Sequence, residues 1–321
     1  MIDLSEHSSL DTLNSLPFWE ENEKVLSMGP AGESNMNLVL RVKTSLRSVI
    51  LKQSKPFVRK FPHIPAPIER IEIELCYYQL IEDDDILSSY SPKVILYDQQ
   101  HHILLIEDLG NGTDFTDIYT HGCRWNPNDL QSISSYLNAL HELEVSNFPL
   151  NQEMKRLNHE HLFHFPFMEE NGIDLDAIQP GLQEKSLKYK TNPALKSALK
   201  LLGKRYLSHG TTLLHGDFHP AAWLRTKDGV KIIDTEFSYM GECEFDLGVL
   251  FAHFDLAKID SSNRDNFLQQ YKYSYSESLV KAYQGMEIMR RLIGIAQLPV
   301  SLSLEEKELL LDKASKLILS Q

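Results

Sequence analysis

The chain of 321 residues has few cysteines, no long apolar run and no signal segment, and each absence excludes a class of protein. Its three cysteines, Cys76, Cys123 and Cys243, are odd in number and far apart, so they support neither a disulfide framework nor a zinc site. We interpret them as buried or incidental thiols. No apolar run approaches the ~18 residues of a membrane-spanning helix, and the first residues lack a basic and apolar leader. We therefore expect a soluble, cytoplasmic protein that does not bind membranes.

The sequence also lacks a block rich in lysine and arginine, and its formal net charge is −13. A surface that follows nucleic-acid phosphates needs clustered positive charge, so we do not expect a nucleic-acid partner. There is no internal repeat and no low-complexity tract. The length suits two domains, or one large two-lobed domain, each with its own core.

The first third of the chain is rich in predicted strands. Short apolar runs with β-branched residues predict strands, and apolar residues at helical spacing predict one helix. The strands are expected at residues 37–42, 48–52, 94–97 and 103–106, and the helix at residues 69–81. A glycine-containing break at residues 110–112 ends this region.

Beyond this break, apolar residues recur with the period of a helix. Stripes over residues 130–140, 195–206 and 310–317 predict three helices. Asn128 and Gln131 have the spacing of an N-terminal capping box, and Ser303 begins the last helix. We therefore expect an α+β fold with a small β-rich lobe, residues 1–109, and a larger helical lobe, residues 110–321.

Two acidic motifs, residues 215–219 (His-Gly-Asp-Phe-His) and 234–236 (Asp-Thr-Glu), flank a predicted hairpin. The hairpin consists of two short apolar runs around Asp228-Gly229, a pair of residues typical of tight turns. Antiparallel strands lie roughly 5 Å apart. A chain that goes out and returns therefore brings Asp217 and Asp234 to the same end of the hairpin.

Three carboxylates in this arrangement are typical of a phosphoryl-transfer site. A carboxylate at Asp217 can accept a hydrogen bond from a substrate hydroxyl. Asp234 and Glu236 offer the hard oxygen ligands that Mg²⁺ prefers when it also holds nucleotide phosphates.

A kinase also needs groups that hold the triphosphate. Lys52 ends the second predicted strand, where its ammonium can reach phosphate oxygens if a helix carboxylate holds it. Glu72 and Glu74 both flank the apolar stripe of the next helix, so the residues alone leave two candidates. The loop of residues 29–37 contains glycines that permit close approach to phosphates, but it is not a P-loop, because Gly-Lys-Ser/Thr is missing. We expect the nucleotide between the lobes, where residues 107–109 can offer backbone groups to adenine.

These motifs resemble the aminoglycoside phosphotransferase and choline kinase superfamily, whose kinase-like fold carries His-Gly-Asp-x-His followed by Asp-x-Asp/Glu. The methylthioribose kinases within it are more similar still. The similarity runs from about residue 25 to the C-terminus, and it is carried by residues 34–39, 51–58, 156–163, 233–237 and 289–296.

The resemblance implies a protein-kinase-like two-lobe fold and a role for individual residues. Asp217 is implied as the catalytic base, Asp234 and Glu236 as Mg²⁺ ligands, and Lys52 with Glu74 as the pair that anchors phosphates. The remaining expected site residues are Ser34, Asn35, Asn37, Glu107 and Leu109 for the nucleotide, Arg290 and Arg291 for the acceptor, and His215 and Asp246 as supports of the catalytic loop. Adjacent helical residues point about 100° apart, so we expect one arginine in the pocket and the other packed elsewhere.

The implied function is ATP- and Mg²⁺-dependent phosphorylation of a small molecule at a sugar hydroxyl. The favoured acceptor is the 1-hydroxyl of 5-methylthioribose, in methionine salvage, and the resemblance also implies a homodimer. Two positions depart from the family pattern. Ala222 stands where the superfamily usually has Asn and methylthioribose kinases often have Ser, and Ser34 replaces a glycine.

Two alternative functions remain open at this point. The first is a kinase of another hydroxylated metabolite, such as choline or an aminoglycoside. The acidic composition favours such cationic acceptors, whereas Arg290 and Arg291 argue against them. The second is a nucleotide-binding regulatory protein with weakened catalysis, which Ala222 supports because alanine cannot bind a metal ion.

Overall fold

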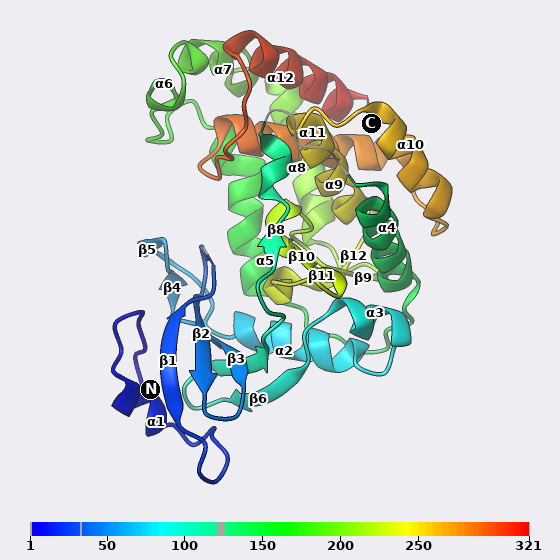
Figure 1. Ribbon diagram of the computed structural model, residues 1–321. Helices are drawn as coiled ribbons and strands as arrows, with labels where there is room; N and C mark the ends of the chain where they lie inside the picture. Colours follow the sequence, from blue (N-terminus) through cyan, green and yellow to red (C-terminus); the bar gives the residue numbers. More distant parts are fainter. Residues whose placement is uncertain (1, 33, 121–125, 321) are drawn as a thin grey trace. The chain divides into compact units, whose positions relative to one another are not determined.

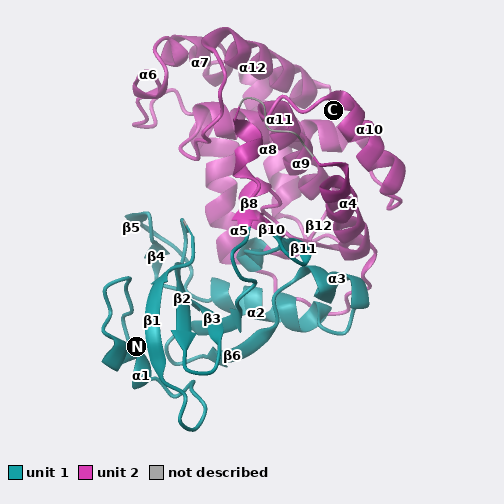
Figure 2. Cartoon of the chain, viewed as in Figure 1, with its two compact units in different colours: residues 1–112, 226–237 teal, residues 113–225, 238–321 magenta. Residues whose placement is uncertain are grey.

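A computed structural model describes residues 2–32, 34–120 and 126–320 (Figure 1). The chain divides into two compact units (Figure 2). The first contains residues 1–112 and 226–237, and the second contains residues 113–225 and 238–321. The expected α+β class is confirmed, because the first unit is built on a sheet and the second is mainly helical.

The sheet of the first unit is antiparallel, with the strand order β1-β2-β3-β7-β6. Its strands are β1 (Val25–Pro30), β2 (Leu38–Thr44), β3 (Ser48–Gln53), β6 (Val94–Asp98) and β7 (Ile103–Glu107). The four predicted strands are confirmed to within two residues at each end, whereas β1 was not predicted. The strand β3 lies between β2 and β7, so Lys52 is opposite Val39 on one side and Leu104 on the other. A small two-stranded sheet, β4 (Phe57–Val58) with β5 (Phe61–Pro65), follows β3 in the chain.

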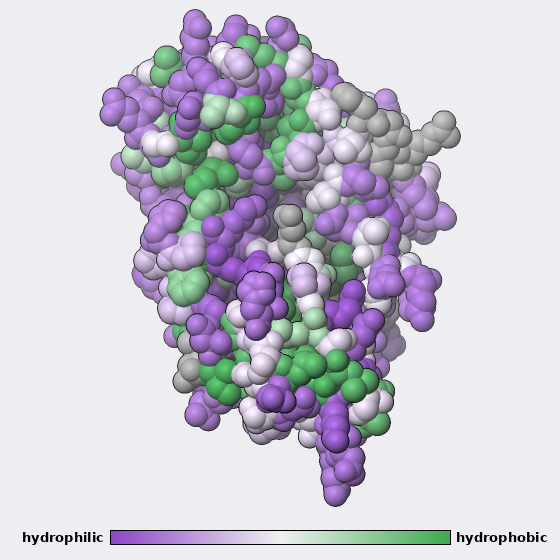
Figure 3. All heavy atoms as spheres, turned by 60° about the vertical axis from the view of Figure 1, so that its left-hand side comes forward, coloured by the Kyte–Doolittle hydropathy of each residue, from purple (hydrophilic) through white to green (hydrophobic). Residues whose placement is uncertain are grey.

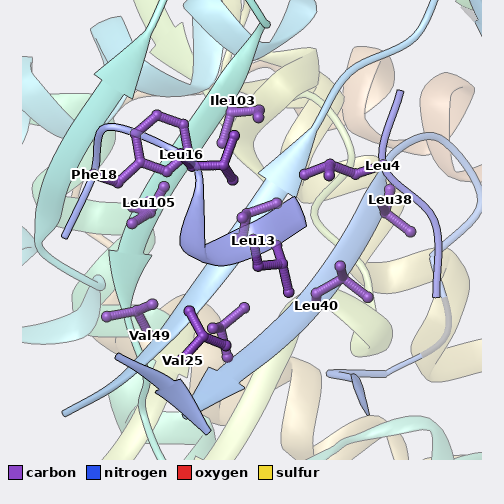
Figure 4. Close-up of a cluster of buried hydrophobic side chains, with 12 residues drawn as sticks. Leu4, Leu13, Leu16, Phe18, Val25, Leu38, Leu40, Val49, Ile103 and Leu105 are labelled. Atoms are coloured by element: carbon purple, nitrogen blue, oxygen red, sulfur yellow. The ribbon is translucent and has the colours of Figure 1, made fainter. Parts of the chain in front are cut away.

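The N-terminal residues complete the core of this unit. The short helix α1 (Leu10–Asn14) begins at Ser9, whose side chain accepts the backbone N–H of Thr12. Leu4, Leu13, Leu16 and Phe18 are buried against apolar residues of the sheet (Figure 4). The sequence pattern gave no sign of this contribution, because the region has no clear periodicity.

The helix expected at residues 69–81 is confirmed as α2 (Arg70–Ile81), and α3 (Asp85–Tyr90) follows it. The segment of residues 226–237 adds β11 (Gly229–Ile232) and η5 (Thr235–Phe237) to this unit. The predicted turn is present, since the Thr226 hydroxyl accepts the N–H of Asp228 and donates to the Gly229 carbonyl. The element η5 packs against α2, so the acidic motif of residues 234–236 belongs to the same unit as Lys52.

The second unit is mainly helical. Its helices are α4 (Pro127–Glu142), α5 (Gln152–His159), α6 (Leu175–Ile178), α7 (Leu182–Lys190), α8 (Pro193–Leu207), α9 (Glu244–Leu256), α10 (Ser261–Gln270), α11 (Glu277–Ile293) and α12 (Leu304–Leu319). Single turns of 3₁₀-helix are η1 (Thr116–Tyr119), η3 (Phe165–Phe167) and η4 (Pro220–Ala222), and η2 (Glu160–His164) is a π-helix. The short strands are β8 (Thr113–Asp114), β9 (Thr212–Leu214), β10 (Trp223–Thr226) and β12 (Tyr239–Gly241).

Two details of the predicted helices are corrected. The N-cap of α4 is Asn126, whose side chain accepts the N–H of Asn128, so the capping box expected at Asn128 is wrong. Proline at the first helical position explains the earlier start, since its fixed φ suits that site. The expected start of α12 at Ser303 is confirmed, and Ser303 forms a capping box with Glu306. The buried stripe of α12 contains Leu311, Ala314 and Ile318, so Leu311 and Ile318 replace the expected Leu310 and Leu317.

Hydrophilic side chains cover most of the face seen in Figure 3, and hydrophobic ones form small groups among them. No helix in the described ranges is long and apolar enough to cross a membrane. Cys76 and Cys243 carry free thiols, as expected, and Cys243 is buried. Cys123 lies outside the described residues.

Candidate active site

The first unit contains a buried cluster of charged side chains centred on Lys52. The ammonium nitrogen of Lys52 lies 2.6 Å from Oε1 of Glu74 and 2.6 Å from Oδ1 of Asp234. Burial lowers the pKa of Lys52, but the two carboxylates outweigh burial and raise it above its ordinary value. The lysine is therefore a permanent cation. Glu72, the other candidate partner, accepts a hydrogen bond from the Tyr97 hydroxyl instead.

Asp234 lies at a distinctive point of the backbone. Its φ of 63° places it in the left-handed region, which non-glycine residues seldom occupy and which is enriched at functional sites. The side chain of Asp234 is 47% exposed, whereas that of Lys52 is buried. The turn therefore presents the Asp234 carboxylate partly to solvent while one oxygen stays bound to Lys52.

Glu236 is held differently. Its Oε2 atom accepts a hydrogen bond from Nδ2 of Asn37 at 2.8 Å and lies 3.2 Å from Nε of Arg70. Burial raises the pKa of Glu236 to about 7, although the positive charge of Arg70 opposes this shift. Asn37, which we expected at the nucleotide phosphates, is thus a buried link between Glu236 and helix α2.

Arg70 is the residue of this cluster that the sequence analysis missed. Its side chain is fully buried, and it donates to Oδ1 of Asn37 and to the carbonyl oxygens of Met36, Lys55 and Pro67. Arg70 precedes Glu74 by four residues on α2, a spacing that puts both side chains on one face of the helix. That spacing, read together with Lys52, was the available signal.

We tested whether the residues of the first unit fit a divalent cation. The carboxyl groups of Glu74 and Asp234 pair with Lys52, and that of Glu236 pairs with Arg70. Oε2 of Glu74 is buried without a hydrogen-bond partner among the described residues. The half-exposed side chain of Asp234 fits Mg²⁺, which prefers one or two carboxylates and several waters. Asp234 is a better candidate ligand for Mg²⁺ than Glu236, because the Oε2 atom of Glu236 already accepts a hydrogen bond.

The described residues contain no group of three or more His, Cys, Asp or Glu side chains that could hold a metal ion. Any ion at Asp234 would need water or phosphate oxygens to complete its coordination. Ala222 stands where the superfamily usually has an Asn that could bind the metal ion. It belongs to the second unit, is buried, and its side chain has no atom that could bind a metal.

The other expected nucleotide residues lie on two segments of the first unit. In the loop before β2, the Ser34 hydroxyl accepts the N–H of Asn37, and the Asn35 carbonyl accepts the N–H of Lys60. At the end of β7, the N–H of Glu107 donates to the carbonyl of Lys93. Between Glu107 and Leu109, Asp108 is fixed by an ion pair with Arg41 at 3.0 Å. These contacts order both segments, and their roles toward a nucleotide remain predictions.

The second unit contains Asp217, in the turn between β9 and η4. Gly216 has a φ of 84°, a left-handed conformation that glycine adopts without strain. Behind this turn, the buried carboxylate of Asp246 accepts the backbone N–H groups of His215 and Gly216 at 2.8 and 3.0 Å. Asp246 in turn lies 3.3 Å from Nε2 of His141. The Asp246 side chain thus binds the backbone of this turn, and its supporting role in catalysis stays a prediction.

Three basic side chains approach the Asp217 carboxylate. Nη1 of Arg290 and Nη2 of Arg291 lie 3.8 and 3.7 Å from Oδ1, and Nε2 of His219 lies 3.3 Å from Oδ2. Burial raises the pKa of Asp217, but His219, Arg290 and Arg291 outweigh burial and hold the pKa well below its usual range. Both arginines contact the aspartate, whereas we expected one of them to point elsewhere.

The expected site residues therefore form two groups. The first unit joins Lys52, Glu74 and Asp234, and the second joins Asp217, Arg290 and Arg291. The proximity of Asp217 to Asp234 stays a prediction, since the two residues belong to different units.

The chain is similar to known phosphotransferases in sequence and in fold. The model of the phosphotransferase enzyme family matches residues 32–290. The methylthioribose kinase of Cronobacter sakazakii is 27% identical over 246 residues, which cover 70% of this chain and 59% of that protein. The methylthioribose kinase of Exiguobacterium sibiricum is 25% identical, with 73% and 62% covered. The chain thus spans about three fifths of the length of these curated relatives.

Solved structures show the fold. Choline kinase LicA from Streptococcus pneumoniae matches with a TM-score of 0.53 and 19% identity, covering 92% of this chain and 94% of that one. The gentamicin complex of APH(2")-IIa matches with a TM-score of 0.53 and 14% identity, covering 100% and 98%. The protein-kinase-like fold expected from the motifs is therefore confirmed. Because the family model covers most of its length, the chain belongs to the phosphotransferase enzyme family, as its resemblance to aminoglycoside phosphotransferases and choline kinases implied.

Proposed function

We propose that this protein is an ATP- and Mg²⁺-dependent kinase that transfers the γ-phosphoryl group to a hydroxyl group of a small sugar. The favoured acceptor is 5-methylthioribose, phosphorylated at its 1-hydroxyl in methionine salvage, and we place the reaction in the cytoplasm. The observation that carries the proposal is the environment of Asp217, an ionised carboxylate beside two guanidinium groups. The proposed acceptor is inferred from the similarity of the chain to methylthioribose kinases.

The low pKa of Asp217 defines its part in the reaction. The carboxylate is ionised at neutral pH, so it can accept a hydrogen bond from the acceptor hydroxyl and orient it. It is a weak base and would take the proton only as the new bond to phosphorus forms. This timing suits a loose phosphoryl transition state, in which positioning and charge stabilisation dominate.

The cationic groups have distinct tasks in the proposal. Arg290 and Arg291 would offset the negative charge that develops on the transferred phosphoryl group. Lys52, held by Glu74, would bind phosphate oxygens of the nucleotide, and Asp234 would hold Mg²⁺, which neutralises phosphate charge when bound.

The acceptor is more consistent with a neutral sugar than with a cation. Two guanidinium groups, that of the buried Arg291 and that of the half-buried Arg290, lie within 4 Å of the Asp217 carboxylate, at 3.7 and 3.8 Å. The N–H groups of these guanidinium groups can donate hydrogen bonds to the oxygens of a polyhydroxylated acceptor, whereas a quaternary ammonium offers them no acceptor atom. This favours a polyhydroxylated acceptor over choline. The regulatory alternative rests on the buried Ala222, whereas the ionised Asp217 beside two arginines speaks for catalysis.

Transfer of radiolabelled phosphate from ATP would test the proposal. The purified protein is incubated with ATP and Mg²⁺ and with 5-methylthioribose, ribose, choline or an aminoglycoside in parallel. We expect transfer to 5-methylthioribose and loss of transfer when the cation is chelated. Transfer to choline alone would replace the proposed acceptor class, and ATP binding without transfer to any acceptor would favour the regulatory alternative.

A further inference from the structure

Arg290 and Arg291 share one buried anion, Glu287, on the same helix. Glu287 is completely buried in α11 and precedes the arginines by three and four residues, so all three side chains lie on one face. Nη1 of Arg290 lies 3.1 and 3.0 Å from the two carboxylate oxygens, and Nε of Arg291 donates to Oε1 at 2.6 Å. Burial raises the pKa of Glu287, but the arginines and His253 lower it well below its usual range. Glu287 is therefore ionised.

A second layer of contacts holds Glu287 from behind. Nε2 of His253 lies 3.3 Å from Oε1 of Glu287, and Nδ1 of His253 is hydrogen-bonded to the Tyr119 hydroxyl. Burial lowers the pKa of His253 to about 3, so its ring is neutral. An ionised carboxylate can only accept, so Nε2 carries the proton, Nδ1 accepts, and the Tyr119 hydroxyl donates. The tautomer of His253 is thus fixed by its two neighbours.

The same histidine also supports Asp217 from the other side. The ring of His219 stacks on the ring of His253, with centroids 5.4 Å apart and planes 22° from parallel. His219 contacts Oδ2 of Asp217, while the two arginines approach Oδ1. The contacts therefore form a ring around Asp217. It runs from His219 through His253 and Glu287 to the two arginines, which approach Asp217 again.

We infer that Glu287 is a positioning residue that clamps Arg290 and Arg291 in the orientation needed beside Asp217. This inference rests on the proposed kinase function, and no residue of the expected site set accounts for the paired orientation of the arginines. The clamp explains why both adjacent arginines point to one place. Each must turn toward Glu287, and that turn brings both toward Asp217.

The clamp also leaves donors available. Among the described residues, Nε of Arg290 and Nη2 of Arg291 are buried without a hydrogen-bond partner. Unsatisfied buried donors are costly, so such groups need an acceptor when the site is filled. Glu287 accepts hydrogen bonds from some of the N–H groups of each arginine, and its negative charge balances one of the two positive charges. The remaining donors keep a fixed direction and do not collapse onto Asp217, from which Nη2 of Arg291 stays 3.7 Å away.

The variant Glu287→Gln tests the clamp, because it keeps the size of the side chain and removes the charge. We expect kcat/KM for the sugar acceptor to fall on the order of 100-fold, since loosely held groups lose their alignment, while the KM for ATP is unchanged. Glu277→Gln is the matched control, because Glu277 lies on the same helix and its exposed side chain pairs with Lys281. This control should retain wild-type kinetics.

Tyr119→Phe is a milder variant for the case in which Glu287→Gln does not fold. It removes only the hydroxyl that donates to His253, and we expect a loss of kcat/KM for the acceptor of roughly tenfold. Equal losses for acceptor and ATP in a folded variant, or wild-type kinetics in Glu287→Gln, would overturn the clamp.

A readout independent of turnover separates the clamp from the proposed function. The Nε–H proton of Arg291, which donates to Glu287, should exchange slowly with solvent in NMR spectra of the wild-type protein and rapidly in Glu287→Gln. Unchanged exchange would overturn the clamp even if the kinase assay succeeds. Absence of transfer by the wild-type protein, with protected exchange, would overturn the function and leave the clamp standing.

Discussion

The ammonium nitrogen of Lys52 lies 2.6 Å from Oε1 of Glu74, and both side chains are buried. The contact joins strand β3 to helix α2. Breaking a buried ion pair by removing one partner is costly, because the remaining charge has lost its counter-ion. The pair therefore serves the stability of the first unit as well as its proposed nucleotide site, and the two contributions can be separated.

The variant Lys52→Met should lose ATP affinity and also stability, by about 3 to 5 kcal/mol. Adding Glu74→Gln to this variant removes the uncompensated charge. We expect the double variant to regain much of the stability but none of the ATP affinity. Urea unfolding and calorimetric titration with ATP measure the two effects. ATP affinity recovered together with stability would mean that Lys52 acts only as a structural residue.

Asp217→Asn should abolish turnover and leave ATP binding largely intact. The amide keeps the shape of the carboxylate but cannot accept a proton, and general-base groups contribute about 10² to 10⁴ in rate. Steady-state kinetics and ATP calorimetry on the same preparation give both quantities. Retained activity would remove Asp217 from its proposed role.

Asp234→Ala should lose the dependence of nucleotide binding on Mg²⁺, because its half-exposed carboxylate is the proposed ligand. Calorimetric titration of ATP with and without Mg²⁺ measures the effect. Glu236→Gln is a useful comparison, since its carboxylate is already bound to Asn37 and close to Arg70. We expect a smaller loss of Mg²⁺ dependence in that variant. Equal losses in the two variants would indicate that both carboxylates bind Mg²⁺. If Asp234→Ala retains Mg²⁺-dependent binding of ATP, Asp234 is not a ligand of the ion.

Lys155 gives the protein a pH-dependent stability outside the site. Its ammonium is buried over the ring of Tyr239, 4.2 Å from the centroid, and donates to the carbonyl of Ser208. Burial lowers the pKa of Lys155 to about 8, below the value of about 10.4 in an unfolded chain. Between these values the folded protein binds fewer protons than the unfolded one, so the free energy of unfolding should rise with pH.

The variant Lys155→Met should lack this rise, which amounts to at most about 3 kcal/mol. Urea unfolding at the two ends of the pH window, for wild type and variant, measures the difference. The exposed Lys200 offers a matched control, and Lys200→Met should follow the wild-type curve. Parallel pH profiles for wild type and Lys155→Met would contradict the prediction.

The sequence predicted the elements whose apolar residues recur with a regular period. Alternating apolar runs located β2, β3, β6 and β7, because a buried sheet needs them. The pattern did not separate Glu72 from Glu74, since both flank the same stripe, and only the contact with Lys52 distinguishes them. The resemblance to the kinase superfamily implied Glu74.

The charged residues around the candidate site that the sequence missed, Arg70 and Glu287, are both buried by distant parts of the chain. Arg70 and Glu287 have helical spacings to expected site residues, but such pairs are usually solvated, so spacing alone is a weak signal. Their burial depends on packing that no local pattern encodes. Likewise, the N-terminal residues around Leu13 join the core although they show no periodicity.

The division of the first unit into residues 1–112 and 226–237 has a consequence for biosynthesis. A ribosome makes Lys52 and Arg70 long before it makes Asp234 and Glu236. Until residue 237 has been synthesised and released from the exit tunnel, Lys52 lacks Asp234 and Arg70 lacks Glu236. The N-terminal segment is therefore not a module that matures first, and we expect its completion to wait for most of the second unit to be translated.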